Sequence, residues 1–133
     1  MKTPTLLAAI GTVFLALSWL LVAATNLGGI ALSPTTRSSL FALQAVAWVC
    51  VLIFFAEHLK FPTMKTHSLL AAIGAGYMAL AALFFAVLNV LTAAGTLSPA
   101  DYPLTLTNIV GALDVVAMAL IANFFVALYK KQR

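Results

Sequence analysis

Charged residues are scarce in this sequence. Of its 133 residues only 8% are charged and 64% are hydrophobic, whereas a soluble domain carries about 25% charged residues. So few charges cannot keep a folded surface in water, which excludes a soluble globular protein. The composition instead predicts an integral membrane protein whose main partner is the lipid bilayer.

Residues that carry out chemistry are also few. Cys50 is the only cysteine, so the chain can form no intramolecular disulfide and has no paired-cysteine motif for a metal or a redox reaction. The sequence has no nucleophile with a base at a recognised spacing and no glycine-rich phosphate loop, which predicts that the protein is not an enzyme and uses no cofactor. Its Lys and Arg residues are too thinly spread to form a nucleic-acid surface.

Hydrophobic residues gather in four long runs, each of which reaches the roughly 20 residues that a helix needs to cross a bilayer. No run is interrupted by proline, because all five prolines lie at or beyond the ends of the runs. The connections are short, so no soluble domain is expected between them. The predicted fold class is all-α: a single four-helix transmembrane bundle over residues 1–133. Its helices are expected at about 5–24, 38–56, 68–93 and 105–129.

The basic residues are distributed unevenly between the two ends of such a bundle. Arg37 alone falls at one end. The other end, which we call the basic end, holds Lys2, Lys60, Lys65, Lys130, Lys131 and Arg133. Cytoplasmic loops carry an excess of Lys and Arg, so we expect the basic end, with both termini and the 57–66 loop, to face the cytoplasm, in a bacterial-type inner or plasma membrane.

Part of the sequence is repeated. When residues 6–26 are aligned with 69–89, more than half of the positions are identical, and Asn26 matches Asn89. A repeat at a fixed shift indicates a duplicated unit, here residues 1–60 and 64–133. The duplication predicts two helical hairpins in parallel, related by an axis along the membrane normal. The alternative is that two Ala- and Leu-rich helices share residues by chance.

The second and fourth runs correspond more weakly. Placing Phe54-Phe55 on Phe124-Phe125 pairs Ala47 with Ala117 and Gln44 with Asp114. The two asparagines of the stronger repeat, Asn26 and Asn89, are expected to end their helices.

Asp114 is the most informative polar residue. It lies well inside the fourth run, where an Asp costs about 2.5–3.5 kcal/mol to insert, so it should face the bundle interior and have a polar partner. Asp114 is therefore either a proton or cation site, or a protonated side chain that bonds a neighbouring helix or subunit. Gln44, at a similar depth, is the expected counterpart of Asp114. Asn123, on the same helix as Asp114, also needs a partner.

Two further groups of residues stand out. Small residues that recur at helical spacing predict close helix packing, and they are Gly11, Ala71, Gly74, Ala75, Ala79 and Gly111. His58, His67 and Glu57 flank the central loop; they could be weak metal ligands, but their spacing matches no recognised site, so ordinary interfacial residues are the preferred interpretation.

Two functions are compatible with these features. Continuous helices and scarce polar residues favour a structural or accessory subunit of a larger membrane complex or a homo-oligomer. The alternative is a small oligomeric channel or transporter, coupled to ions or protons, that uses Asp114.

Overall fold

The structure is a computed structural model that describes residues 2–30, 32–96, 98 and 104–132. Over these residues the chain is all-helical, and each of its four long helices is long and apolar enough to cross a membrane. The predicted all-α class with four apolar helices is therefore confirmed. Each helix extends a few residues beyond the predicted run. In chain order the elements are α1 (Lys2–Leu27), α2 (Pro34–His58), the short 3-10 helix η1 (Pro62–Met64), α3 (Lys65–Ala93) and α4 (Leu104–Gln132).

Glycines, not asparagines, end α1 and α3. Gly29 and Gly95 have φ angles of 69° and 76°, a left-handed conformation in which glycine has no Cβ penalty. In both helices the next amide reaches back five residues, from Ile30 to Thr25 O and from Thr96 to Leu91 O, which is the Schellman arrangement. The expectation that Asn26 and Asn89 end these helices is wrong, since glycine adopts the terminating conformation more readily.

A serine caps the start of α2. The Ser33 side chain accepts a hydrogen bond from the backbone amide of Thr36 at 3.2 Å, and Pro34 occupies the first turn, where its missing N–H costs little. The corresponding tripeptide before α4, residues 97–99, lies largely outside the described residues.

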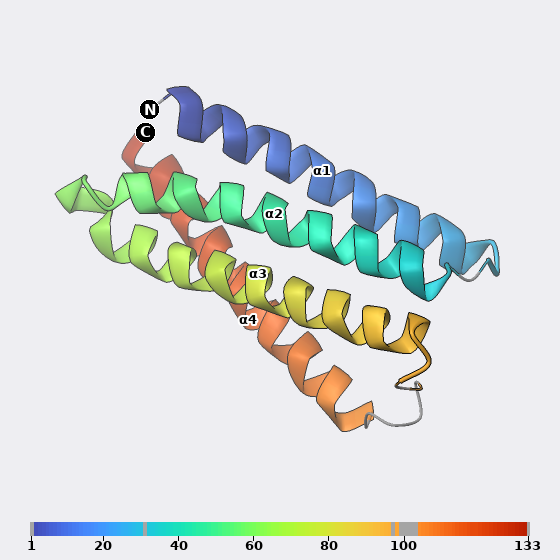
Figure 1. The fold of residues 1–133 in the computed structure, drawn as a ribbon. Helices are drawn as coiled ribbons and strands as arrows, with labels where there is room; N and C mark the ends of the chain where they lie inside the picture. Colours follow the sequence, from blue (N-terminus) through green and yellow to red (C-terminus); the bar gives the residue numbers. More distant parts are fainter. Residues whose placement is uncertain (1, 31, 97, 99–103, 133) are drawn as a thin grey trace.

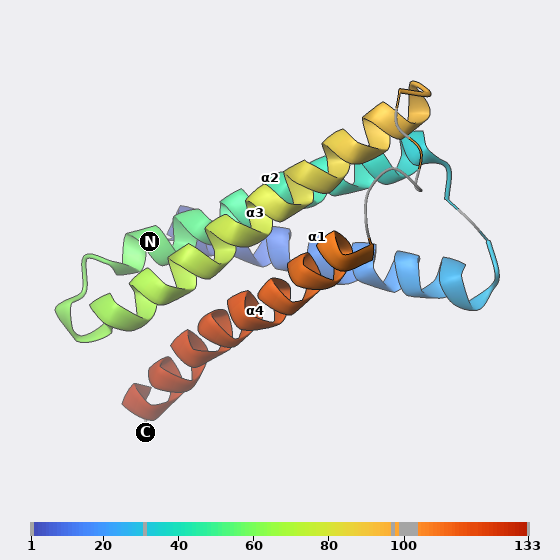
Figure 2. The ribbon, with the colours of Figure 1, turned by 90° about the horizontal axis from the view of Figure 1, so that it is seen from below.

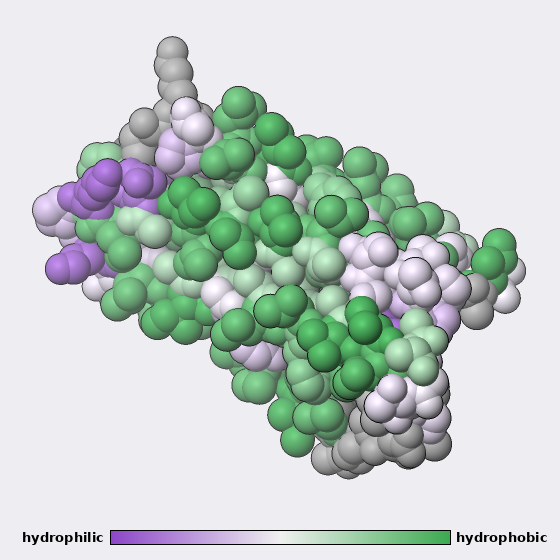
Figure 3. All heavy atoms as spheres, in the orientation of Figure 1, coloured by the Kyte–Doolittle hydropathy of each residue, from purple (hydrophilic) through white to green (hydrophobic). Residues whose placement is uncertain are grey.

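The helices pack in chain order, α1 on α2, α2 on α3 and α3 on α4. Figure 1 shows α1, α2 and α3 side by side, whereas α4 crosses behind α3 so that its Leu104 end points away from α1. In Figure 2, which shows the bundle from below, α4 runs in nearly the same direction as α3 and stands apart from α2 and α3 in this view. Both ends of the chain and η1 lie at the same end of the bundle, and the most hydrophilic residues gather there (Figure 3).

The core lies along α2 and α3 and is made of small and aromatic residues. Ala71 and Ala75 of α3 are completely buried, as are Phe55 of α2 and Phe124 of α4. Large aliphatic side chains face outward along every long helix, for example Leu20 at 65% exposure and Val115 at 70%. An apolar outer surface around a core of small residues is the pattern expected in lipid, where close packing rather than exclusion of water holds helices together.

Candidate functional site

A large apolar cleft separates α1 from α4. Its volume is about 1020 Å³, large enough for a sizeable ligand or for side chains of another protein. Trp48 and Phe55 of α2 and Met78 of α3 form its floor, and residues of α1 and α4 form its two walls. The wall residues are Thr5, Ala8, Ala9, Thr12, Val13, Leu15 and Trp19 on α1, and Asp114, Val115, Met118, Ile121, Ala122 and Phe125 on α4.

Among the described residues that line this cleft, Asp114 is the only acid. It is half-buried, and its Oδ1 atom is fully enclosed without a hydrogen-bond partner among the described residues. The Tyr77 hydroxyl of α3 lies close to the Asp114 carboxyl, but it donates its hydrogen bond to the carbonyl oxygen of Val110, one turn earlier on α4, at 3.0 Å. Asp114 thus has Tyr77 as a polar neighbour, while its enclosed Oδ1 atom has no hydrogen-bond partner among the described residues.

Gln44 is directed away from Asp114, towards α1. Its Nε2 atom donates to the Ser18 hydroxyl at 2.9 Å, and Ser18 in turn donates to the Leu15 carbonyl oxygen at 3.1 Å. Gln44 and Ser18 are both buried, with 4% and 3% exposure. The structure therefore gives Gln44 the interhelical bonding role expected for a membrane amide, with Ser18 as its partner.

Sequence reasoning did not identify Ser18 or Tyr77 as partners. A signal for Ser18 was present, because Gly11 and Ser18 stand seven residues apart, two helical turns, and so share one face of α1. For Tyr77, no sequence signal specified that its hydroxyl would reach α4.

Asn123 lies near the basic end and contacts His67. The Asn123 Nδ2 and His67 Nδ1 atoms are 3.0 Å apart and join α4 to α3. The other residues considered as metal ligands are held elsewhere: His58 Nδ1 lies 2.8 Å from the Phe54 carbonyl oxygen, and Glu57 pairs with Lys60 at 2.6 Å. The described residues include no group of three or more side chains that could hold a metal ion.

Two of the glycines let helices approach closely. A Cβ atom built on Gly11 would lie 2.8 Å from the Ala47 carbonyl oxygen, and one built on Gly74 would lie 2.7 Å from the Ala117 carbonyl oxygen. A side chain at either position would therefore force the two backbones apart. Gly111 differs, since a Cβ there would have no heavy atom within 4 Å.

The stripe of small residues on α3 is buried. Ala71 and Ala75 are completely enclosed, and Ala79 packs at the edge of the core. All three therefore lie where close helix packing was expected.

Aromatic side chains join α2 to α4 near the basic end. The Phe54 and Phe124 ring centroids are 6.0 Å apart, as are those of Phe55 and Phe125, while Phe55 and Phe124 meet edge to face at 4.9 Å. Edge-to-face pairs are the preferred geometry of aromatic rings. Three rings of this aromatic cluster, those of Phe54, Phe55 and Phe125, also line the cleft.

Comparison with protein families, with curated proteins and with solved structures gives no match for this chain. Its function is therefore inferred from the cleft and the side chains around it.

Proposed function

We propose that this protein is a structural or accessory subunit of a membrane complex, and that a transmembrane helix of another subunit occupies the cleft between α1 and α4. The observation that carries this proposal is the acidic side chain of Asp114 in the wall of an otherwise apolar cleft. Its Oδ1 atom is enclosed by the chain itself, so a partner helix would have to reach the carboxyl through its other oxygen. A polar group in hydrocarbon costs several kcal/mol unless it is hydrogen-bonded, so a partner that supplies a donor inside the cleft would be strongly favoured.

The chemistry of the chain favours a different protein over a second copy as that partner. All Lys and Arg residues lie near helix ends, at 2, 37, 60, 65, 130, 131 and 133. A second copy could offer Asp114 only neutral donors at this depth, whereas another subunit could also offer a Lys or Arg in its span, and a cation pairs more strongly with a carboxyl than a neutral donor does.

Two substitutions in the cleft test this assignment. Asp114→Leu removes the carboxyl and should weaken association by about 1–2 kcal/mol, whereas Asp114→Asn retains hydrogen-bonding atoms and should preserve the complex. Val115→Trp should displace the partner by filling the cleft, since Val115 is 70% exposed and lines it. Val116→Leu is the matched control, on the same helix but outside the cleft lining.

The measurement is the size and composition of the assembly in mild detergent, by native gel and mass spectrometry. The proposal requires a second protein that remains with wild type, Asp114→Asn and Val116→Leu and dissociates from Asp114→Leu and Val115→Trp. A purely homo-oligomeric assembly would refute the choice of partner. A wild-type protein that stays monomeric in every mild detergent would refute the accessory role.

The second candidate function is a small channel or transporter, in which Asp114 binds protons or cations within an oligomer. The position of the carboxyl in the cleft wall supports this alternative. Because an amide cannot titrate, Asp114→Asn would then abolish ion flux into liposomes while leaving assembly intact. Unchanged flux in Asp114→Asn would eliminate this candidate.

The proposed architecture is a pair of parallel hairpins from a duplication, α1–α2 and α3–α4, related by a pseudo-two-fold axis along the membrane normal. Two observations support it. The glycine contacts Gly11–Ala47 and Gly74–Ala117 join residues that correspond in the repeat.

The aromatic cluster is the second observation. Phe54 contacts Phe124, and Phe55 contacts Phe125, so each residue meets its own counterpart in the repeat, as occurs where a two-fold axis passes between equivalent residues. The open α1–α4 side departs from this symmetry, because an ideal two-fold would pack α4 on α1 as closely as α2 on α3. The excess of basic residues supports the proposed orientation, with both termini in the cytoplasm of a bacterial-type cell.

A further inference from the structure

A second, smaller pocket lies at the end of the bundle opposite the two chain ends. Its volume is about 280 Å³, and its lining comes from the end of α1, the start of α2 and the end of α3. Thr25 and Asn26 stand on one side and Asn89 on the other. Phe41 and Phe85, whose ring centroids are 5.5 Å apart, form an apolar part of the lining.

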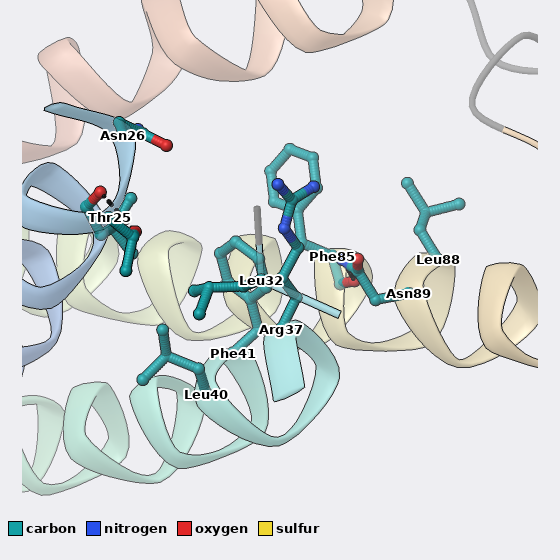
Figure 4. Close-up of a pocket in the computed structure, with 10 residues that line it drawn as sticks. Thr25, Asn26, Leu32, Arg37, Leu40, Phe41, Phe85, Leu88 and Asn89 are labelled. Atoms are coloured by element: carbon teal, nitrogen blue, oxygen red, sulfur yellow. Dashed lines mark hydrogen bonds between the residues drawn. The ribbon is translucent and has the colours of Figure 1, made fainter. Parts of the chain in front are cut away.

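Arg37 is the charged residue of this pocket. It belongs to the first turns of α2, and its guanidinium points away from that helix into the space between Asn26 and Asn89 (Figure 4). Of the acids on described residues, Glu57 pairs with Lys60, and Asp114 lies in the wall of the α1–α4 cleft. Arg37 has no ion pair among the described residues.

The polar side chains beside Arg37 can also donate hydrogen bonds. Asn89 uses one N–H of its amide to bond the Phe85 carbonyl oxygen at 2.8 Å, which leaves its second N–H available. Asn26 is exposed. The pocket therefore combines a cation and amide donors at the level of the helix ends with aromatic and aliphatic residues one or two turns deeper.

Arg37 is the one Lys or Arg residue at this end of the bundle. It is therefore the one basic side chain there that can pair with an anionic group of the adjacent leaflet.

We propose that this pocket binds the phosphodiester group of an anionic glycerophospholipid from the adjacent leaflet. A guanidinium matches the geometry of phosphate oxygens with two parallel hydrogen bonds. The two asparagines can bond a hydroxylated headgroup, and Phe41 and Phe85 can pack on the first carbons of an acyl chain. This site is independent of the α1–α4 cleft and of the function proposed for it.

Native mass spectrometry tests the proposal on the purified full-length protein, with equal amounts of phosphatidylglycerol and phosphatidylcholine added in detergent. Wild type should retain phosphatidylglycerol in preference to phosphatidylcholine. Arg37→Gln should weaken phosphatidylglycerol binding about fivefold or more, as expected for removing one basic residue beside an anionic headgroup. Arg37→Lys should keep part of the affinity, because it keeps the charge and loses the fork geometry.

Lys131→Gln is the matched control, because it removes the same charge from an exposed residue at the opposite end of the bundle; it should bind phosphatidylglycerol like wild type. Equal loss in Lys131→Gln and Arg37→Gln would overturn the proposal, as would equal retention of the two lipids. Inorganic phosphate alone should raise the melting temperature less than phosphatidylglycerol does. Equal rises would overturn the lipid assignment and show that the pocket binds a free anion. Arg37 is exposed and forms no ion pair with any described residue, so Arg37→Gln should fold normally. Circular dichroism checks this.

Discussion

Gly74 and Ala117 lie so close that a Cβ on the glycine would come within 2.7 Å of the alanine carbonyl oxygen. Backbone meets backbone at this point, with no side chain between α3 and α4. Gly11 and Ala47 have the same relationship between α1 and α2, at 2.8 Å. The α1–α2 pair and the α3–α4 pair thus each contain one point at which a glycine lets the two backbones approach closely.

Alanine substitutions at these glycines should therefore destabilise the protein. Gly11→Ala and Gly74→Ala must push two backbones apart, and overpacking of this kind costs about 1–3 kcal/mol. Gly76→Ala and Gly111→Ala are the controls, since a Cβ at either position meets open space. The controls should be as stable as wild type, or up to about 1 kcal/mol more stable because alanine favours helix.

Reversible unfolding in mixed detergent and dodecyl sulfate micelles, followed by circular dichroism, gives these free energies. If all four variants unfolded at the same dodecyl sulfate fraction, the close approach of the helices would contribute nothing to stability.

The bond between Gln44 and Ser18 should couple α1 to α2. Removing either group alone, by Gln44→Leu or Ser18→Ala, leaves the other buried polar atom without its partner. The double variant should therefore lose less stability than the sum of the two single losses. We expect a coupling free energy of about 0.6–2 kcal/mol from the double-mutant cycle. Strict additivity would show that the two side chains do not interact in the folded protein.

The sequence was sufficient to predict the four helices but not the partners of their polar residues. Helices in hydrocarbon must satisfy their own backbone bonds, so a long apolar run specifies a spanning helix almost by itself. The depth of Gln44 and Asp114 also follows from the rise per residue. The direction in which each side chain points depends on how each helix is rotated against its neighbours, which hydropathy does not encode. Gln44 therefore faces Ser18 on α1, and Asp114 faces the cleft.

The sequence also did not predict the open side of the bundle, between α1 and α4. The repeat predicts that α1 and α4 should pack as α2 and α3 do, yet α4 crosses α3 with its Leu104 end directed away from α1 (Figure 1). The Ser38 hydroxyl of α2 donates to the Ala86 carbonyl oxygen of α3 at 3.0 Å. The counterparts of these two residues in the repeat are Asn108 and Ala23. The asparagine carries a larger, exposed side chain, and this difference at one position is a local reason for unequal packing.

Phe124 should contribute far more to stability than its neighbour Phe125. Phe124 is completely buried among aromatic rings, whereas Phe125 is 48% exposed. Phe124→Ala leaves a cavity whose cost for a buried aromatic is about 3–5 kcal/mol. Phe125→Ala removes a ring that lipid can partly replace, so its cost should be clearly smaller. Equal losses in the same unfolding titration would contradict the packing of α2 on α4 at the basic end.

The last prediction concerns the orientation of the bundle in the membrane. Single cysteines are placed at Ser98, after α3, and at Thr63 in η1, in a Cys50→Ala background that removes the native thiol. Both positions are exposed, so the reactivity of each new cysteine with a membrane-impermeant thiol reagent depends on its side of the membrane. Ser98→Cys should react in intact cells, and Thr63→Cys should react only after the membrane is opened. The physical reason is the gathering of basic residues at the end that holds η1 and both chain ends, because short basic loops are retained in the cytoplasm.

Adding Lys residues beside Ser98 provides the complementary test, since a charge-determined orientation should then become mixed or inverted. Labelling of Thr63→Cys but not Ser98→Cys in intact cells would reverse the orientation and place Arg37 in the cytoplasmic leaflet.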